Sequence, residues 1–452
     1  MDHRYNMGEM STPRSKPITV ALPTLGCKAN RYDSDTLARA LIARGYVIVP
    51  PDQPADVYIV NTCTVTGGAD AKSRKMLRRA LRLNSTAKLI VTGCYASLEP
   101  ETIGAIDGVD AVIPIPEQHR IPDLIARLCP APVVPDQFVS PPPQSLSASI
   151  ERTRATVKVQ DGCNLRCAFC AVTLARGDVR SQPVDDVTAE LRALVAGGIR
   201  EIVLTGIRLD AYGLDLPRQR LADLLDATQD LGITRLRLSS LEPIGIDEHL
   251  IARMAAHPTL CHHFHLCLQS GDDGVLSAMR RGYTAARFQE IVAQLRGAMP
   301  DATFTTDVIV GFPGETEEAF ANTCALLEEI GFIKLHVFKF SPRPGTAAFT
   351  MTPRVPDALK DTRSQVLLDL ERRLFAWHAQ KLVGTRASVL VERSGKAGDG
   401  LTPQYLRVCA PFPSSTEGTI QDVRITGYSD HSLLASPCNS GDNLKGISRD
   451  IQ

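Results

Sequence analysis

The chain has 452 residues, enough for about three domains at roughly 150 residues each. Hydrophobic residues make up 44% and charged residues 22%, which excludes a mostly disordered, collagen-like or coiled-coil protein. The 50 Lys and Arg balance the 50 Asp and Glu, so any nucleic-acid partner would have to be held by a local basic patch.

Two features of the sequence bear on its compartment. No run approaches 18 apolar residues, and residues 1–17 contain no apolar stretch, so neither a membrane span nor a secretory signal is predicted. We therefore expect a cytoplasmic protein with no membrane partner. Because cytosolic thiols stay reduced, the twelve cysteines favour metal, cluster or catalytic roles over disulfides.

The first part of the chain alternates strand-like and helix-like segments after a predicted disordered tail at 1–17. The strand-like runs are 18–22, 57–60 and 88–91, and the helical patterns between them are 34–44 and 69–83. This βαβαβ order predicts a parallel sheet, and we assign it to a domain at 18–129. Six prolines at 130–143 predict an exposed linker, placed at 130–150.

A barrel-like region is predicted at 151–379. Its strand-like segments are separated by enough chain for one helix each: 155–159, 201–205, 235–239, 264–268, 304–310 and 335–340. Six such units predict part of an α/β barrel, because a full barrel needs eight. A small all-β barrel is predicted at 380–436, with strands at 387–391, 405–408 and 422–425, before a second tail at 437–452. The fold class is α/β throughout the first two domains.

The strongest chemical signal is the group Cys163, Cys167 and Cys170, directly after the first barrel strand. Three thiolates within eight residues can hold an iron–sulfur cube and leave its fourth iron without a protein ligand. A small molecule can bind at such an open position. Spacing alone leaves a zinc site as the alternative, with a fourth ligand from His262, His263 or His265.

A second group is Cys27, Cys63 and Cys94, each following a predicted strand of the first domain. In an open parallel sheet, residues at the carboxyl ends of the strands converge in space. These cysteines could therefore hold a second cluster. The alternative for each one taken singly is a small buried thiol.

The spacing Cys-x3-Cys-x2-Cys, with Phe169 before the last cysteine, resembles the signature of radical S-adenosylmethionine (SAM) enzymes. This resemblance implies a partial TIM barrel in which SAM binds the open iron through its amino and carboxylate groups. One-electron reduction then releases a 5′-deoxyadenosyl radical.

With the second cysteine group and the terminal β domain, the chain resembles the methylthiotransferase family from about Thr19 to Ser436. The resemblance implies two 4Fe–4S clusters, one that cleaves SAM and one that carries or presents sulfur. It also implies two SAM molecules, one as the methyl donor and one as the radical source.

Segments 24–34, 61–66 and 69–74 are most similar to the branch that converts N6-threonylcarbamoyladenosine at tRNA position 37 to its 2-methylthio derivative. The pair Lys28-Ala29 differs from the Pro-Lys of the ribosomal-protein branch and the Gln-Met of the isopentenyladenosine branch. Two departures from the favoured branch are Ala29, where it typically has Val, and residues 171–174. The alternatives are therefore an isopentenyladenosine tRNA or an Asp of a ribosomal protein.

The resemblance also assigns cofactor contacts and partners. It places Thr205 and Gly206 near the SAM amino group, Gln269 near the active centre, and Gly311, Phe312 and Pro313 near the SAM adenine. A TRAM-like RNA-binding barrel is implied at 380–436, although six Lys and Arg against five Asp and Glu there support RNA binding only weakly. The expected partners are a tRNA anticodon loop and a one-electron reductant such as flavodoxin or ferredoxin, and the expected state is a monomer.

A basic helix gives an independent indication of an RNA substrate. No acidic residue occurs between Ala71 and Leu98, and one half of the predicted helix carries the basic residues Lys72, Arg74, Lys75, Arg78, Arg79 and Arg82. We predict that this face binds tRNA phosphates, the alternative being a merely solvated surface.

A further alternative is a non-catalytic iron–sulfur or zinc protein that binds RNA or senses redox state. It would release no 5′-deoxyadenosine from SAM.

The remaining cysteines are expected to be packing or surface residues: Cys129, Cys261, Cys267, Cys324, Cys409 and Cys438. Of the three neighbouring histidines, only His263 and His265 can share a strand face, and a structural role is expected for them.

Overall fold

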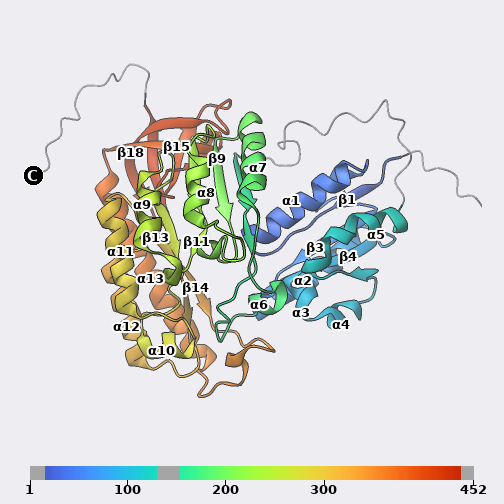
Figure 1. Ribbon diagram of the computed structural model, residues 1–452, viewed down its shortest axis with the longest axis horizontal. Helices are drawn as coiled ribbons and strands as arrows, with labels where there is room; N and C mark the ends of the chain where they lie inside the picture. The colour runs from blue at the N-terminus through green and yellow to red at the C-terminus, as the bar shows by residue number, and fades with distance from the viewer. Residues whose placement is uncertain (1–15, 130–152, 439–452) are drawn as a thin grey trace, which may run out of the picture. The chain divides into compact units, whose positions relative to one another are not determined.

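The computed structural model describes residues 16–129 and 153–438, which form two compact units (Figure 1). Of the described residues, 16–129 and 174–176 belong to the first unit, and 153–173 and 177–438 to the second. Apart from 16–17 and 437–438, the predicted tails lie outside the described residues, as does the predicted linker. No helix in the described ranges is both long and apolar enough to cross a bilayer.

The first unit is built on a parallel sheet of five strands in the order β2-β1-β3-β4-β5. The strands are β1 (Thr19–Ala21), β2 (Val47–Val49), β3 (Val57–Thr62), β4 (Lys88–Gly93) and β5 (Ala111–Val112). The helical segments are α1 (Lys28–Ile42), α2 (Gly67–Leu83), α3 (Cys94–Leu98), α4 (Pro100–Gly104), the 3-10 turn η1 (Ile115–Arg120) and α5 (Ile121–Leu128). The predicted parallel sheet is confirmed, while β2 and β5, three and two residues long, are too short to carry a hydrophobic pattern.

Helices cover both faces of this sheet, as is usual for a parallel sheet. In β3, Val57 and Ile59 pack in one core with residues of α1 and α5. Tyr58 and Val60 pack in the other core with residues of α2, α3 and α4. Helix α1 begins six residues before the predicted start at Ser34, with Cys27 in the extended N-cap conformation. Consequently the polar residues of its first turns are buried beside the ends of the strands.

The second unit opens with a partial barrel of parallel strands, which confirms the predicted α/β barrel with six units. Sheets β10-β9-β6 and β11-β12-β13-β14 follow one another, with Ser239 alone between β10 and β11. The strands are β6 (Arg154–Lys158), β9 (Glu201–Thr205), β10 (Arg235–Leu238), β11 (Ser240–Leu241), β12 (His263–Leu266), β13 (Thr303–Val310) and β14 (Lys334–Lys339). A two-stranded antiparallel ribbon adds β7 (Gln160–Asp161) and β8 (Arg180–Ser181).

Helices connect these strands along the outside of the barrel (Figure 1). They are α7 (Val184–Ala196), α8 (Leu221–Thr228), α9 (Glu248–Ala256), α10 (Asp273–Ala278), α11 (Ala285–Ala298) and α12 (Glu317–Ile330), and α13 (Asp357–Leu382) follows the last strand. Helix α6 (Val172–Arg176) lies between β7 and β8 in the chain, and its residues 174–176 belong to the first unit. Short 3-10 turns are η4 (Leu209–Ala211), η5 (Pro243–Gly245) and η6 (Ala347–Thr350).

The chain ends in a closed five-stranded barrel in the order β15-β16-β17-β19-β18, which confirms the predicted all-β domain. The strands are β15 (Arg386–Arg393), β16 (Gly395–Leu401), β17 (Arg407–Phe412), β18 (Ile420–Ser429) and β19 (Ser432–Pro437). Its core includes Val389, Val408 and Ile425. Strand β16 escaped prediction because three of its seven residues are glycine, which is unfavourable in strands.

Candidate active site

Three cysteines of the first unit lie at the carboxyl edge of its sheet. Cys27 directly precedes α1, Cys63 follows β3, and Cys94 follows β4. Burial, with a smaller contribution from the nearby charges of Cys27 and Cys63, raises the pKa of Cys94 to about 12. The three thiols are thus close enough to interact electrostatically, although their role as cluster ligands stays a prediction.

Gly93 allows Cys94 to stand directly at the end of β4. Its φ is +96°, a backbone conformation that side chains disfavour. A Cβ atom at this position would lie 2.3 Å from the carbonyl oxygen of Thr62. Glycine is therefore required for β4 to pass straight into α3.

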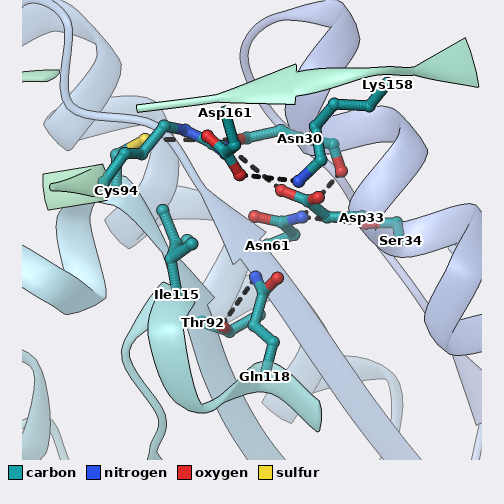
Figure 2. A network of polar contacts seen from close by, with 12 residues as sticks. Asn30, Asp33, Ser34, Asn61, Thr92, Cys94, Ile115, Gln118, Lys158 and Asp161 are labelled. Atoms are coloured by element: carbon teal, nitrogen blue, oxygen red, sulfur yellow. Dashed lines mark hydrogen bonds and ion pairs between the residues drawn. The ribbon is translucent and has the colours of Figure 1, made fainter. Parts of the chain in front are cut away.

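Two buried asparagines tie the strand ends of the first unit to α1 (Figure 2). Asn30 Nδ2 donates to the carbonyl oxygens of Leu25 at 2.8 Å and Thr62 at 2.9 Å. Asn61 Nδ2 in turn donates to the carbonyl oxygen of Asn30 at 2.8 Å and to Ser34 Oγ at 3.0 Å. These hydrogen bonds hold the backbone on both sides of Cys27 and the backbone just before Cys63.

Arg176 brings a positive charge into the same network of the first unit. It is fully buried and donates to Asn30 Oδ1 at 2.5 Å and to Asp33 Oδ2 at 3.1 Å. The Cys94 thiol lies 3.9 Å from Asn30 Oδ1, and the guanidinium counteracts the rise of the Cys94 pKa. No sequence pattern indicated a role for Arg176, which stands between Ala175 and Gly177.

The second cysteine group lies in the loop after β7. The loop is fixed by its own backbone: Cys163 N–H donates to the Gly177 carbonyl at 3.0 Å, and Cys170 N–H to the Cys167 carbonyl at 3.0 Å. The N–H of Val172 donates to Cys170 Sγ at 3.4 Å. Burial raises the pKa of Cys170 to about 12, and the charges of its two companions add to the rise.

Arg281 is a site residue that sequence reasoning missed. Its guanidinium donates to Cys167 Sγ at 3.1 Å and to the Cys267 carbonyl at 2.9 Å, and it pairs with the carboxylate of Glu242. Burial raises the pKa of Glu242 to about 7 against the opposing effect of this arginine. Only the fold joins Arg281, Glu242 and Cys167, since they come from segments at least 39 residues apart.

Both cysteine groups suit a 4Fe–4S cluster by their donor chemistry. Each offers three thiols and no competing carboxylate or imidazole ligand in the set. The N–H of Val172 donates to Cys170 Sγ, and the backbone N–H groups of Val65 and Leu165 lower the pKa of Cys63 and of Cys163 against the effect of burial. Hydrogen bonds of this kind stabilise thiolates and tune the potential of iron–sulfur clusters.

The residues assigned to SAM by resemblance lie at the carboxyl ends of barrel strands. Thr205 ends β9, and Gly206 N–H donates to Ser239 Oγ at 3.2 Å. Gln269 follows β12 with a φ of 70°, and its N–H donates to the Asp307 carbonyl. Gly311, Phe312 and Pro313 follow β13. Their SAM contacts stay predictions.

The basic face of α2 is largely exposed. Lys72, Lys75, Arg78, Arg79 and Arg82 are exposed, whereas Leu77 and Ala80 are buried against the sheet. Arg74 differs from the others, because it is half-buried and donates to the Tyr95 hydroxyl at 2.8 Å. Binding of tRNA by this face stays a prediction.

The three neighbouring histidines differ in their contacts, and the remaining cysteines differ in their burial. His263 and His265 both contact Thr305 Oγ1, at 3.1 and 3.0 Å, so they share a face as predicted. His262 instead pairs with Asp301. Cys261 and Cys267 are buried, and Cys129, Cys324, Cys409 and Cys438 are half-buried.

Comparison with family models gives two matches. The model described as "Uncharacterized protein family UPF0004" matches residues 19–114, and that of the radical SAM superfamily matches residues 157–327. The second match contains Cys163, Cys167 and Cys170, and the first contains the other three candidate ligands.

Curated relatives cover nearly the whole chain. The threonylcarbamoyladenosine tRNA methylthiotransferase MtaB of Thermotoga maritima is 36% identical over 92% of this chain and 96% of its own. The protein of the same name from Bacillus subtilis is 36% identical over 96% and 98%. The chain belongs to the radical SAM methylthiotransferase family. A tRNA-2-methylthio-N(6)-dimethylallyladenosine synthase of Methylacidiphilum infernorum is 32% identical over 94% and 95%.

A solved structure agrees with the fold of this radical SAM methylthiotransferase. The radical SAM methyltransferase TsrM of Kitasatospora setae superposes with a TM-score of 0.54 at 16% identity, covering 74% of this chain and 77% of that one. As family membership implies, the cofactors of the enzyme are 4Fe–4S clusters and SAM.

Proposed function

We propose that this methylthiotransferase converts N6-threonylcarbamoyladenosine at position 37 of tRNA to its 2-methylthio derivative. The observation that carries the proposal is the presence of two separate cysteine groups, one in each unit, of which each suits an open cluster. Four relatives that bear the name of this tRNA activity support the substrate. An isopentenyladenosine tRNA is the second candidate, because one relative is named for dimethylallyladenosine.

In this proposal, Cys163, Cys167 and Cys170 hold the cluster that supplies the electron for SAM cleavage. Cys27, Cys63 and Cys94 hold the cluster that handles sulfur. Arg281 holds Cys167 in place through its hydrogen bond to the thiol sulfur. Thr205, Gly206, Gln269 and 311–313 would contact SAM at the carboxyl ends of the barrel strands.

The remaining parts of the proposal concern the partners and the organisation of the chain. The exposed basic residues of α2 would contact phosphates of the anticodon arm, and adenosine 37 would be splayed out of its stack to reach the barrel. Flavodoxin or ferredoxin would supply the electron, and the enzyme would act as a cytoplasmic monomer. The domains would be 18–129, 151–379 and 380–436.

The first test is an anaerobic turnover assay with SAM and dithionite. The substrates are tRNA bearing N6-threonylcarbamoyladenosine, tRNA bearing isopentenyladenosine, and unmodified tRNA, and the nucleosides are read by mass spectrometry. We expect a methylthio product from the first substrate alone. Product from the isopentenyl substrate alone would overturn the substrate assignment in favour of the second candidate.

Iron analysis tests the ligand assignment independently of turnover. Two 4Fe–4S clusters give about eight iron atoms per chain, and replacing either cysteine group by alanine should leave about four. An EPR signal should remain in each variant. About four iron atoms in the wild type, or zinc in place of iron, would contradict the two-cluster proposal.

A further inference from the structure

The interior of the partial barrel carries a polar group that the cluster sites do not use. Strand β12 is paired with β13 so that His265 stands opposite Thr305 and Phe264 opposite Phe304. The Phe304 ring lies against Arg296 of α11, which places this set of side chains on the helix-covered side. His265 and Thr305 therefore face the other side, which is the barrel interior.

His265 and Asp307 form the centre of this interior group. Nε2 of His265 lies 3.4 Å from Oδ1 of Asp307, and their side chains are 13% and 28% exposed. This contact is not a hydrogen bond between the two side chains, and it becomes an ion pair only when the imidazole is protonated. The imidazole N–H and the carboxylate thus lie side by side, each with accessible surface.

Thr305 sets the orientation of the His265 ring. Its Oγ1 lies 3.0 Å from Nδ1 of His265 and 3.1 Å from Nε2 of His263. A lone pair on Nε2 of His265 would face the Asp307 carboxylate unfavourably, so that nitrogen carries the proton. Thr305 Oγ1 accordingly donates to Nδ1 of His265 and accepts from Nε2 of His263. This leaves the N–H at Nε2 of His265 as a donor and the Asp307 carboxylate as an acceptor, both held in place.

We propose that His265 and Asp307 bind the N6–H and N7 edge of the substrate adenine inside the barrel. Adenine presents a donor at N6 beside an acceptor at N7, and proteins recognise this edge with one acceptor and one donor placed side by side. The Asp307 carboxylate would accept from N6–H, and the His265 Nε2–H would donate to N7. The nitrogen N6 keeps one hydrogen after acylation, so the edge survives in threonylcarbamoyladenosine.

This binding mode also orients the reacting carbon. Carbon 2 of adenine lies across the purine from the N6 and N7 edge. With that edge held by His265 and Asp307, carbon 2 would face away from β12 and β13 and, in this proposal, toward the Cys163 to Cys170 loop that follows β7. The inference rests on the proposed adenosine substrate and adds the residues that would recognise its base.

The same side chains could instead hold a metal ion. The ligand atoms of His265, Cys267 and Asp307 all lie within 4.8 Å of one another. The partial exposure of His265 and Asp307 and their fixed donor and acceptor favour a base edge. A metal ion at this position is treated as a contrary outcome of the test.

The experiment is a cycle that combines a protein variant with a substrate analogue. Dissociation constants are measured for the cluster-loaded full chain without SAM, using anticodon stem–loops that carry threonylcarbamoyladenosine or its 7-deaza analogue. For the wild type we expect the analogue to bind about tenfold more weakly, because one hydrogen bond to N7 is lost. For H265F, which fills the space without an N–H donor, both stem–loops should bind equally.

Two further variants keep the test decisive. T305V retains His265 but removes the partner of its Nδ1. The loss of affinity on replacing the normal stem–loop by the 7-deaza analogue should therefore be smaller than in the wild type but still measurable. H262A alters a histidine outside the barrel interior and should keep the full penalty. Iron content and melting temperature identify any variant that fails to fold.

The outcomes separate this inference from the proposed function. An equal penalty in the wild type and H265F would overturn the inference, as would a metal ion beyond the cluster iron that is lost in H265F. No preference of the wild type for the threonylcarbamoyl stem–loop over an unmodified one would instead contradict the proposed function.

Discussion

Arg281 donates a hydrogen bond to the thiol sulfur of Cys167 over a donor–acceptor distance of 3.1 Å, and both side chains are buried. A full positive charge beside one candidate cluster ligand stabilises extra negative charge on that ligand. Glu242 balances the charge of Arg281, so the ion pair with this carboxylate also holds the guanidinium in place.

The first prediction follows from this contact. Replacing Arg281 by Met should lower the reduction potential of the cluster at Cys163, Cys167 and Cys170, because the reduced state loses a stabilising charge. We expect a shift on the order of 60 mV, which is a tenfold change for one electron. EPR-monitored redox titration measures it, and R287M, at an exposed site paired with Glu290, serves as the control. An unchanged potential with full iron content would argue against the tuning role of Arg281.

The second prediction concerns the glycine that precedes Cys163. Gly162 has a φ of +70°, and a Cβ atom there would lie 2.0 Å from the Asp178 carbonyl oxygen. G162A should displace the loop and reduce the iron content from about eight to about four atoms per chain. Gly198 also has a positive φ, but its added Cβ would meet nothing within 4 Å, so G198A should keep its iron. Full iron in G162A would show that the loop tolerates the change.

The third prediction concerns the exposed basic face of α2. Replacing Lys75, Arg78 and Arg82 together by Ser should weaken binding of all tRNAs and reduce the salt dependence of binding by about one unit of slope per lost phosphate contact. Arginines that already form exposed ion pairs provide a matched triple control: Arg253, Arg287 and Arg373. Filter binding at several salt concentrations gives both slopes. Equal slopes in the two triple variants would favour the solvated-surface alternative.

The fourth prediction concerns Arg237, which forms a buried ion pair inside the α/β barrel and hydrogen bonds to the terminal β barrel. Arg237 donates to Glu201 at 2.7 Å and to the carbonyl oxygens of Thr402 at 2.6 Å and Pro403 at 2.7 Å. Arg237→Ala leaves a buried carboxylate and two carbonyl groups without this donor, so it should destabilise the second unit by about 3 kcal/mol.

Urea unfolding measures this loss. The control is Arg287→Ala, which removes an exposed pair and should cost less than about 1 kcal/mol. Similar urea midpoints for the two variants would mean that Arg237 contributes no more than a surface residue.

The sequence by itself determined the fold class and the position of both cysteine groups. Strand periodicity, a βαβ order and six barrel units are local patterns, and the predicted strands 201–205 and 57–60 match β9 and the first part of β3. Two cysteine groups follow strand ends, and chain topology alone brings such ends together in a parallel sheet.

Only the tertiary structure decided which polar residues surround those cysteines. Arg281 and Cys167 are 114 residues apart, and Arg176 and Asn30 are 146 residues apart, so no local pattern relates them. The early start of α1 likewise depends on burial of Asn30 against Thr62, a contact that an isolated segment cannot make. Hydrogen bonds and charge–charge interactions between distant segments exist only after the chain has folded. Hydrophobic periodicity, by contrast, is a property of neighbouring residues and can be recognised in the unfolded sequence.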